Sequence, residues 1–276
     1  MIPCRKEASI RQDIDAQRQH AFMTLSEFDL SGRSALVTGG SGELGFVMAS
    51  ALARAGAAVI LVGRDSVKLD KAVASLSSRG HDAEARLCDL LHPGQVARLV
   101  EEVEARRPID ILINNAGIQK RRPLADVDIA DWERMIGTHL TAPFVMAQSV
   151  SAAMVKRGYG KIINILSIAS ELGRAGIVPY TAAKGGLKML TRGLAAELGP
   201  SNIQVNGIGP GYFRTEMNRQ LFEDPTFDAW VCARTPLRRW AHPSELAGAA
   251  VFLASDASSF MTGQVIYVDG GLTASV

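Results

Sequence analysis

The chain contains few cysteines, few aromatic residues and no marked excess of either charge. Its three cysteines, Cys4, Cys88 and Cys232, are too few and too scattered for a disulfide framework or a metal site. The 30 Lys and Arg residues nearly balance the 28 Asp and Glu residues, and the longest basic run is Lys120-Arg121-Arg122. We therefore expect neither a nucleic acid nor an anionic membrane as a partner.

Long apolar segments are missing as well. No apolar run reaches 18 residues, which argues against a transmembrane span, and the polar first seven residues lack the apolar core of a signal peptide. These absences predict a cytoplasmic protein. The 276 residues, of which 47% are hydrophobic, are enough for one sizeable core.

The chain divides into two regions that differ in composition and in apolar periodicity. Residues 1–30 mix Arg, Gln, Asp and His without an apolar period, which predicts an N-terminal tail or a docking segment. Residues 31–276 alternate short apolar runs with helical patterns and contain no linker, so we expect a single domain. The predicted strands are 34–38, 58–62, 83–88, 109–113, 161–166, 203–207 and 264–268, and the helices between them include 46–54, 66–79, 94–106, a long stretch ending near 157, one ending near 198, and 244–254. This alternation predicts an α/β fold, a Rossmann-like doubly wound parallel sheet of about seven strands with helices on both faces.

A glycine-rich loop, residues 39–45, joins the first predicted strand to an Ala-rich helix. The first amides of a helix are unpaired and lie at the positive end of its dipole, which suits a pyrophosphate. Glycine is needed there because a Cβ would keep the backbone away from the ligand. An ordinary Gly-rich turn is the alternative. The position of the loop after the first strand of a βαβ unit favours a nucleotide.

Tyr180 and Lys184 are four residues apart on a predicted helix, so their side chains leave the same face. An ammonium beside a phenol favours the phenolate and lowers a pKa that is about 10 when unperturbed. We expect Tyr180 to work as an acid or base near neutral pH. Ser167 adds a hydroxyl at the end of a predicted strand. A Tyr and a Lys at this spacing also occur by chance, so the pair alone is suggestive.

Taken together, the motifs resemble the short-chain dehydrogenase/reductase family over nearly all of residues 30–276. The resemblance rests on the order and spacing of Thr38-Gly39 to Gly45, Asp89, Asn114-Asn115-Ala116-Gly117, Ser167, Tyr180 to Lys184, Asn206, Pro210-Gly211 and Val268-Asp269-Gly270-Gly271. It implies an enzyme that moves hydride between a nicotinamide cofactor and a secondary alcohol or ketone.

The resemblance also implies roles for the site residues. Tyr180 would exchange a proton with the substrate oxygen, Ser167 would hydrogen-bond that oxygen, and Lys184 would hold the nicotinamide ribose. The remaining cofactor-binding residues would be Gly39, Ser41, Gly42, Leu44 and Gly45 in the loop, Arg64, Asp89, Leu90, Asn115, Ala116 and Gly117 on the adenosine side, and Pro210, Gly211, Phe213 and Thr215 near the nicotinamide.

Two residues depart from the family pattern. Glu43 replaces the middle glycine of the loop, and its carboxylate could repel a pyrophosphate unless the side chain turns to water. His139 stands where the family usually has the Asn that links the lysine to a water chain. An imidazole can donate and accept, so we predict that His139 acts with the catalytic residues as a proton relay. A structural histidine is the alternative.

Cofactor choice depends on the end of the second strand, where NAD-preferring relatives usually carry an acid. Here Gly63 is followed by Arg64, which could pair with a 2'-phosphate. NADP is therefore favoured over NAD, although Asp65 could oppose the phosphate. Arg64 as a solvated surface residue is the alternative.

Residues 210–239 typically fold over the active site in this family, so the identity of the substrate depends on them. Residues 209–217 and 234–240 are most similar to the gluconate 5-dehydrogenase group of sugar-acid oxidoreductases, as are residues 117–119 and 170–172. This resemblance implies a small-molecule substrate. The carboxylate of a sugar acid would suit the cations Lys120, Arg121, Arg122 and Arg214, unless these are plain surface charge. The alternatives are a 3-oxoacyl-thioester reductase and a catalytically silent nucleotide-binding scaffold. Residues 252–256 and 265–268 resemble the subunit-contact edge of the family, which predicts a homotetramer.

Overall fold

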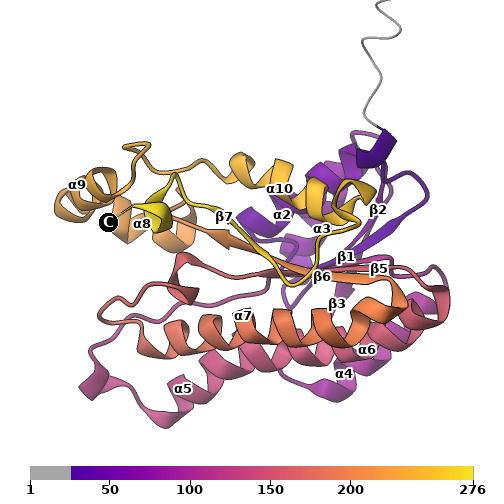
Figure 1. Cartoon of the computed structure of the whole chain (residues 1–276), viewed down its shortest axis with the longest axis horizontal. Coiled ribbons are helices and arrows are strands. Elements are labelled where there is room, and N and C mark those ends of the chain that lie inside the picture. The colour runs from indigo at the N-terminus through magenta and orange to yellow at the C-terminus, as the bar shows by residue number, and fades with distance from the viewer. Residues whose placement is uncertain (1–25, 276) are drawn as a thin grey trace, which may run out of the picture.

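A seven-stranded parallel sheet runs through the computed structural model, which describes residues 26–275 (Figure 1). The strand order is β3-β2-β1-β4-β5-β6-β7. The strands are β1 (Ser34–Thr38), β2 (Ala58–Gly63), β3 (Ala83–Leu87), β4 (Ile111–Asn114), β5 (Gly160–Ile165), β6 (Ile203–Pro210) and β7 (Val265–Val268). The prediction of a Rossmann-like, doubly wound sheet is confirmed.

Helices cover both faces of the sheet. One layer contains α2 (Glu43–Arg54), α3 (Ser66–Ser77) and α10 (Ala247–Ala254), and the other contains α4 (Pro93–Glu104), α6 (Ala142–Arg157) and α7 (Val178–Leu198) (Figure 1). The short helix α5 (Ile129–Ile136) leads into α6 through a π-helical turn, η3 (Gly137–Thr141). No helix within residues 26–275 is long and apolar enough to cross a bilayer.

The core explains why the central strands are apolar without interruption. Every residue of β1, β4, β5 and β6 is buried, as expected for strands covered on both faces. Successive side chains point to opposite faces. On β1, Leu36 packs in the core beneath α4 and α6, whereas Val37 packs in the core beneath α2 and α10.

Several boundaries differ from the predicted ones for local physical reasons. Strand β6 continues to Pro210, beyond the predicted end at residue 207, because Pro210 pairs with Val268 at the last position of the strand. A proline without an N–H is tolerated at such an end. Helix α2 begins at Glu43, three residues before the predicted start, so the second half of the glycine loop already belongs to its first turn.

The topology creates a crevice between β1 and β4. The chain moves outward from β1 to β2 and β3 and then returns to β4 on the other side of β1. The loops that follow these two strands therefore separate, which is where doubly wound sheets bind ligands. Residues 211–242, which we call the lid, leave β6 and form η6 (Glu216–Asn218), α8 (Arg219–Phe222) and α9 (Pro225–Arg234). Helices α8 and α9 lie at one end of the sheet, outside its two helical layers (Figure 1).

Candidate active site

A cavity of about 510 Å³ lies where β1, β4, β5 and β6 end and the lid begins. Most of the residues predicted from the sequence line it: Gly39, Gly42, Leu44, Gly45, Asn115, Ala116, Gly117, His139, Ser167, Tyr180, Lys184, Pro210, Gly211, Phe213 and Thr215. Ser41, Arg64, Asp89 and Leu90 are outside its lining. The structure thus gathers the residues predicted for the nicotinamide side together with Asn115, Ala116 and Gly117, whereas Arg64, Asp89 and Leu90, also predicted for the adenosine side, lie outside the cavity.

The glycine loop is held against β4 by Thr38 and Asn115. The Thr38 hydroxyl accepts the N–H groups of Asn115 and Ala116 at 2.9 and 3.1 Å, and the Asn115 amide donates to the carbonyls of Thr38 and Gly39. Gly39 has a φ of +63°, and a Cβ on Gly45 would lie 2.3 Å from the Gly39 oxygen. Only glycine fits at these two positions.

The N-terminus of α2 is open toward the cavity. Gly42 is its N-cap and supplies no side-chain cap, so the first-turn N–H groups are left for another acceptor. Glu43 does not occupy this place, because its carboxylate accepts the Glu216 N–H of the lid at 2.6 Å. The open helix end and the close glycine backbone fit the pyrophosphate of a dinucleotide. Glu43 therefore joins the loop to the lid, a contact that the sequence pattern did not predict.

Ser167, Tyr180 and Lys184 meet in the cavity. Ser167 follows β5 and caps the turn η4 (Ile168–Ser170) by accepting the Ala169 N–H at 3.1 Å, and it also hydrogen-bonds the Tyr180 phenol. Lys184 donates to the Ile165 carbonyl at 2.6 Å, and its Nζ lies 5.6 Å from the centroid of the Tyr180 ring. One helix, α7, thus presents the phenol and the ammonium to the end of β5.

Burial changes the acidity of this trio against our expectation. Desolvation raises the pKa of Tyr180 above its ordinary value, while the Ser167 hydrogen bond and then the charge of Arg121 act to lower it. Desolvation also lowers the pKa of Lys184 to about 7. The expectation that Lys184 lowers the pKa of Tyr180 is wrong in this structure, because a buried lysine near pH 7 loses much of the charge that would stabilise a phenolate.

His139 lies on η3 and packs edge-on against Tyr180, with the ring centroids 5.1 Å apart. Its Nε2 is 2.8 Å from the Ile118 carbonyl and 3.1 Å from the Ile118 N–H, and the shorter contact with the carbonyl favours Nε2 as the donor, whereas its buried Nδ1 has no hydrogen-bond partner within the described part of the chain. Burial, followed by the charge of Lys184, lowers the pKa of His139 to about 3. The imidazole is therefore neutral at physiological pH. With Nε2 as donor, Nδ1 carries a free lone pair beside the phenol.

A chain of buried polar side chains supports the floor of the site. The Asn114 amide donates to Asn164, which donates to the Thr191 hydroxyl, and each of these bonds measures 2.9 Å. Thr191 in turn donates to the Leu187 carbonyl at 2.8 Å. The chain links β4, β5 and α7, so the helix that carries Tyr180 is fixed against the strand that precedes Ser167. Asn164 and Thr191 carry no motif signal that would have identified them.

Arg64 and its neighbours lie at the carboxyl end of β2. Arg64 is exposed and forms no hydrogen bond or ion pair with any residue of the range 26–275. Asp65 caps α3 by accepting the Lys68 N–H at 3.0 Å. Its charge is thereby directed to a helix N-terminus, which weakens the expected opposition to a phosphate. Asp89 accepts the Leu91 N–H and lies 3.4 Å from His92.

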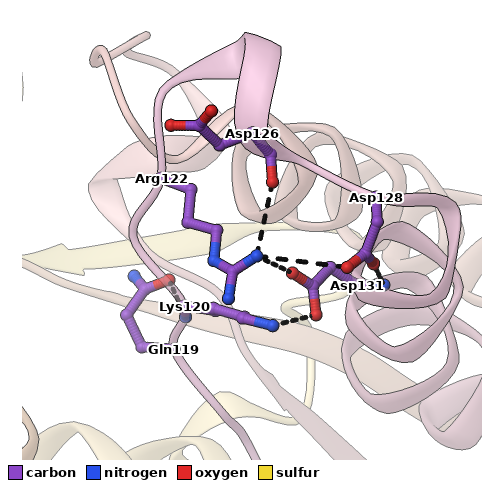
Figure 2. Close-up of polar contacts among 6 residues, drawn as sticks. All are labelled: Gln119, Lys120, Arg122, Asp126, Asp128 and Asp131. Carbon is purple, nitrogen blue, oxygen red and sulfur yellow. Dashed lines mark hydrogen bonds and ion pairs between the residues drawn. The ribbon is translucent and has the colours of Figure 1, made fainter.

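The four cations predicted to face the substrate are divided by the structure. Lys120 and Arg122 both pair with Asp131, and Arg122 also lies 4.0 Å from Asp128 (Figure 2). Arg214 is 3.9 Å from Asp228. These three do not line the cavity, which favours the alternative that they are surface charge. Only Arg121 of the four lines the cavity, where it donates to Asn218 at 3.0 Å.

Two further arginines and a group of aromatic residues complete the cavity wall. Arg174 and Arg234 line it together with Tyr212 and Trp230. None of these four was predicted from the sequence. The sequence did contain a signal for the aromatic ones, because six of the sixteen aromatic residues fall within residues 210–243: Tyr212, Phe213, Phe222, Phe227, Trp230 and Trp240.

Comparisons with known proteins agree with this geometry. A family model described as Enoyl-(Acyl carrier protein) reductase matches residues 41–273. Gluconate 5-dehydrogenase of Gluconobacter oxydans is 48% identical over 90% of this chain and 98% of its own. The 5-keto-D-gluconate 5-reductase of Escherichia coli K12 is 46% identical over the same shares.

A solved structure is similar throughout. It is a gluconate 5-dehydrogenase from Burkholderia cenocepacia in complex with NADP and tartrate, with 46% identity, a TM-score of 0.88, and coverage of 91% of this chain and 98% of that one. The family model covers residues 41–273 and the relatives cover nine tenths of the chain, and the chain belongs to the short-chain dehydrogenase/reductase family of oxidoreductases.

Proposed function

We propose that this protein is an NADP-dependent oxidoreductase that interconverts a keto sugar acid and the corresponding hydroxy sugar acid, as a gluconate 5-dehydrogenase does. The observation that carries the proposal is the meeting of Ser167, Tyr180 and Lys184 in a cavity that also contains arginines with no carboxylate partner among residues 26–275. An anionic polyol suits such a cavity because guanidinium groups bind carboxylates with charge-assisted hydrogen bonds. The relatives named for gluconate chemistry support the same substrate class.

In the proposed mechanism, the nicotinamide supplies or takes up the hydride. Tyr180 gives its phenolic proton to the carbonyl oxygen in the direction of reduction and recovers it in oxidation. Ser167, already hydrogen-bonded to Tyr180, orients that oxygen. The uncapped first turn of α2 and Lys184 hold the cofactor, and Phe213 and Thr215 border its nicotinamide end.

Lys184 would assist Tyr180 in a way that differs from a fixed cation. With a pKa lowered to about 7, it is able to accept or release a proton under working conditions. His139, neutral and with a free Nδ1 lone pair, is suited to hold a water molecule beside this pair. We therefore keep His139 as a relay that works without becoming an imidazolium.

Two alternatives remain open to test. A 3-oxoacyl-thioester reductase would call for a longer apolar channel, whereas this cavity contains Arg121, Arg174 and Arg234. The departures of Glu43 and His139 from the family pattern would suit a catalytically silent nucleotide-binding scaffold. Against it, the Glu43 carboxylate is bonded to the lid, which leaves the helix end free.

We also propose a domain organisation and a location. A single domain spanning 31–276 and a cytoplasmic location rest on the sequence, and most of the expected tail at 1–30 lies outside the described residues.

We propose that the protein is a homotetramer. This assembly is supported by the position of β7 at an edge of the sheet and by exposed apolar side chains on α6 and α7, including Phe144, Val155 and Met189. Unprotected sheet edges and apolar helix faces are normally covered by a partner.

The proposed activity is tested by cofactor oxidation with a panel of keto sugar acids, neutral ketones and acetoacetyl thioesters, each with NADPH and NADH. We expect turnover of a keto sugar acid with NADPH. Tyr180→Phe should retain the melting temperature and NADPH binding but lose more than about nine tenths of kcat, or about 1.4 kcal/mol of barrier, because only the ionisable oxygen is removed. Absence of turnover with every substrate would favour the scaffold.

Cofactor choice is tested by Arg64→Ala. Loss of a charge-assisted contact with the 2'-phosphate should raise the KM for NADPH by about tenfold or more and leave the KM for NADH nearly unchanged. Arg79→Ala, which removes another exposed arginine just beyond α3, should change neither value. Equal effects of Arg64→Ala on both cofactors would show that Arg64 does not bind the phosphate.

The role of His139 is tested by replacing it with Asn, Ala and Leu. If it holds a relay water, Asn should preserve kcat per folded active site, whereas Ala and Leu should lower it by about tenfold, within the range for proton-transfer groups. Undiminished kcat in His139→Leu would end the relay hypothesis.

A measurement of thermal stability against pH reports what His139 contributes to the stability of the fold. The unfolded chain binds a proton at His139 below about pH 6.5, while the folded chain excludes it down to about pH 3, so His139 makes the protein less stable as pH falls through this window. His139→Asn should reduce that acid sensitivity, whatever its effect on turnover.

The assembly is tested by light scattering of the purified protein. A homotetramer should give about four times the 29.5 kDa mass of the chain. Charged substitutions at Phe144 and Met189 should lower this mass if α6 and α7 form the contact. A mass near 30 kDa for the unmodified protein would remove the proposal.

A further inference from the structure

The cavity holds an excess of positive charge that the protein itself does not neutralise. Arg121, Arg174 and Arg234 line it, and none of them has a carboxylate within 4.0 Å among residues 26–275. Arginines close by, such as Arg122 and Arg239, are paired with Asp131 and Glu245. Desolvation and then the charge of Arg174 lower the pKa of Arg121, so these two guanidinium groups repel each other. An anion between or beside them would relieve that repulsion.

Arg174 differs from Arg121 in what holds it. It lies on the loop between η4 and α7, and its guanidinium lies 5.1 Å from the centroid of the Phe227 ring in the lid. Its Nη1 also lies 3.5 Å from the Tyr212 hydroxyl. A guanidinium has five N–H donors, so one weak contact with Tyr212 leaves most of them available. The aromatic contact orients the group without neutralising it.

Tyr212 and Phe227, the two lid residues that contact Arg174, are themselves held in place. Tyr212 makes edge-to-face contacts with Phe227, Trp230 and Trp240, with centroid distances of 5.7, 6.0 and 5.3 Å. Such contacts hold aromatic rings in defined orientations. Arg174 is therefore supported by an ordered aromatic cluster that belongs to the lid, although Arg174 itself comes from the loop between η4 and α7.

The two arginines act differently on the reacting centre. The charge of Arg121 acts on the Tyr180 phenol and lowers its pKa. Arg174 is not among the groups that shift the pKa of Tyr180, although it lines the same cavity. Arg174 is therefore the guanidinium that can be neutralised without removing a charge that acts on the phenol.

We propose that Arg174 binds the carboxylate of the substrate and is the residue that selects keto acids over neutral ketoses. The inference rests on the proposed function. A carboxylate held at Arg174 would keep the rest of the substrate in the cavity that Ser167 and Tyr180 also line. Binding of the carboxylate would also tie the substrate to the lid through Tyr212 and Phe227.

The test compares two substrates that differ in charge, 5-ketogluconate and L-sorbose, with NADPH in excess. Arg174→Met should raise the KM for 5-ketogluconate by about 10- to 150-fold, the range expected for a lost hydrogen bond to a charged group. The kcat/KM for sorbose should stay within about twofold of the unmodified enzyme. Arg174→Lys should recover only part of the loss, because an ammonium lacks the planar fork and stacks poorly on Phe227.

Matched controls separate this effect from folding and from general charge. Arg122→Met removes an arginine already paired with Asp131 and should leave both substrates unaffected. Phe227→Leu should raise the KM for 5-ketogluconate by a smaller factor than Arg174→Met, since it removes only the support. NADPH binding and melting temperature report whether each variant is folded.

The outcomes distinguish the inference from the function on which it rests. If the unmodified enzyme reduces sorbose but no keto acid, both are overturned. If it reduces 5-ketogluconate and Arg174→Met changes the KM values for both substrates by the same factor, or changes neither, the function stands and the assignment of Arg174 is wrong.

Discussion

The site depends on the contact between the ends of β1 and β4, two strands that are neighbours in the sheet but not in the chain. Asn115 donates two hydrogen bonds to Thr38 across this contact, and the glycine loop closes on them so tightly that a Cβ on Gly39 would lie 2.9 Å from Ala116. The crevice exists because the chain changes direction here. Loosening this junction would separate the open end of α2 from the residues that border Tyr180.

Burial, more than pairing, controls the chemistry of the residues in the crevice. It raises the pKa of Tyr180, lowers the pKa of Lys184 to about 7 and lowers the pKa of His139 to about 3. All three shifts favour the neutral form, as expected where water is replaced by protein. At neutral pH Tyr180 and His139 are then neutral and Lys184 is close to half protonated, so the charge that develops during proton transfer is met by groups fixed before the reaction.

The sequence predicted the sheet well because its strands are buried on both faces and therefore appear as continuous apolar runs. The glycine loop and the Ser167, Tyr180 and Lys184 pattern were found because each is a local arrangement. Predictions failed where partners are distant in sequence. Nothing near Lys120 indicates that Asp131 would neutralise it, and nothing near Glu43 indicates the Glu216 N–H. The sign of the Tyr180 shift also depended on burial, which spacing does not reveal.

Arg121 and Arg174 can serve two purposes in the cavity, stabilising the phenolate and binding the carboxylate, that a single guanidinium could not serve at once. Arg121 acts on the Tyr180 phenol as a positive charge and so favours its ionised form, and unlike Lys184 it keeps its charge at neutral pH. If Arg121 alone received the substrate carboxylate, that charge would be neutralised and the phenol would become a weaker acid. A second guanidinium, Arg174, is held by Phe227 and does not shift the pKa of the phenol, so it can take the carboxylate instead. Arg121 is then left to stabilise the phenolate while the anion is bound.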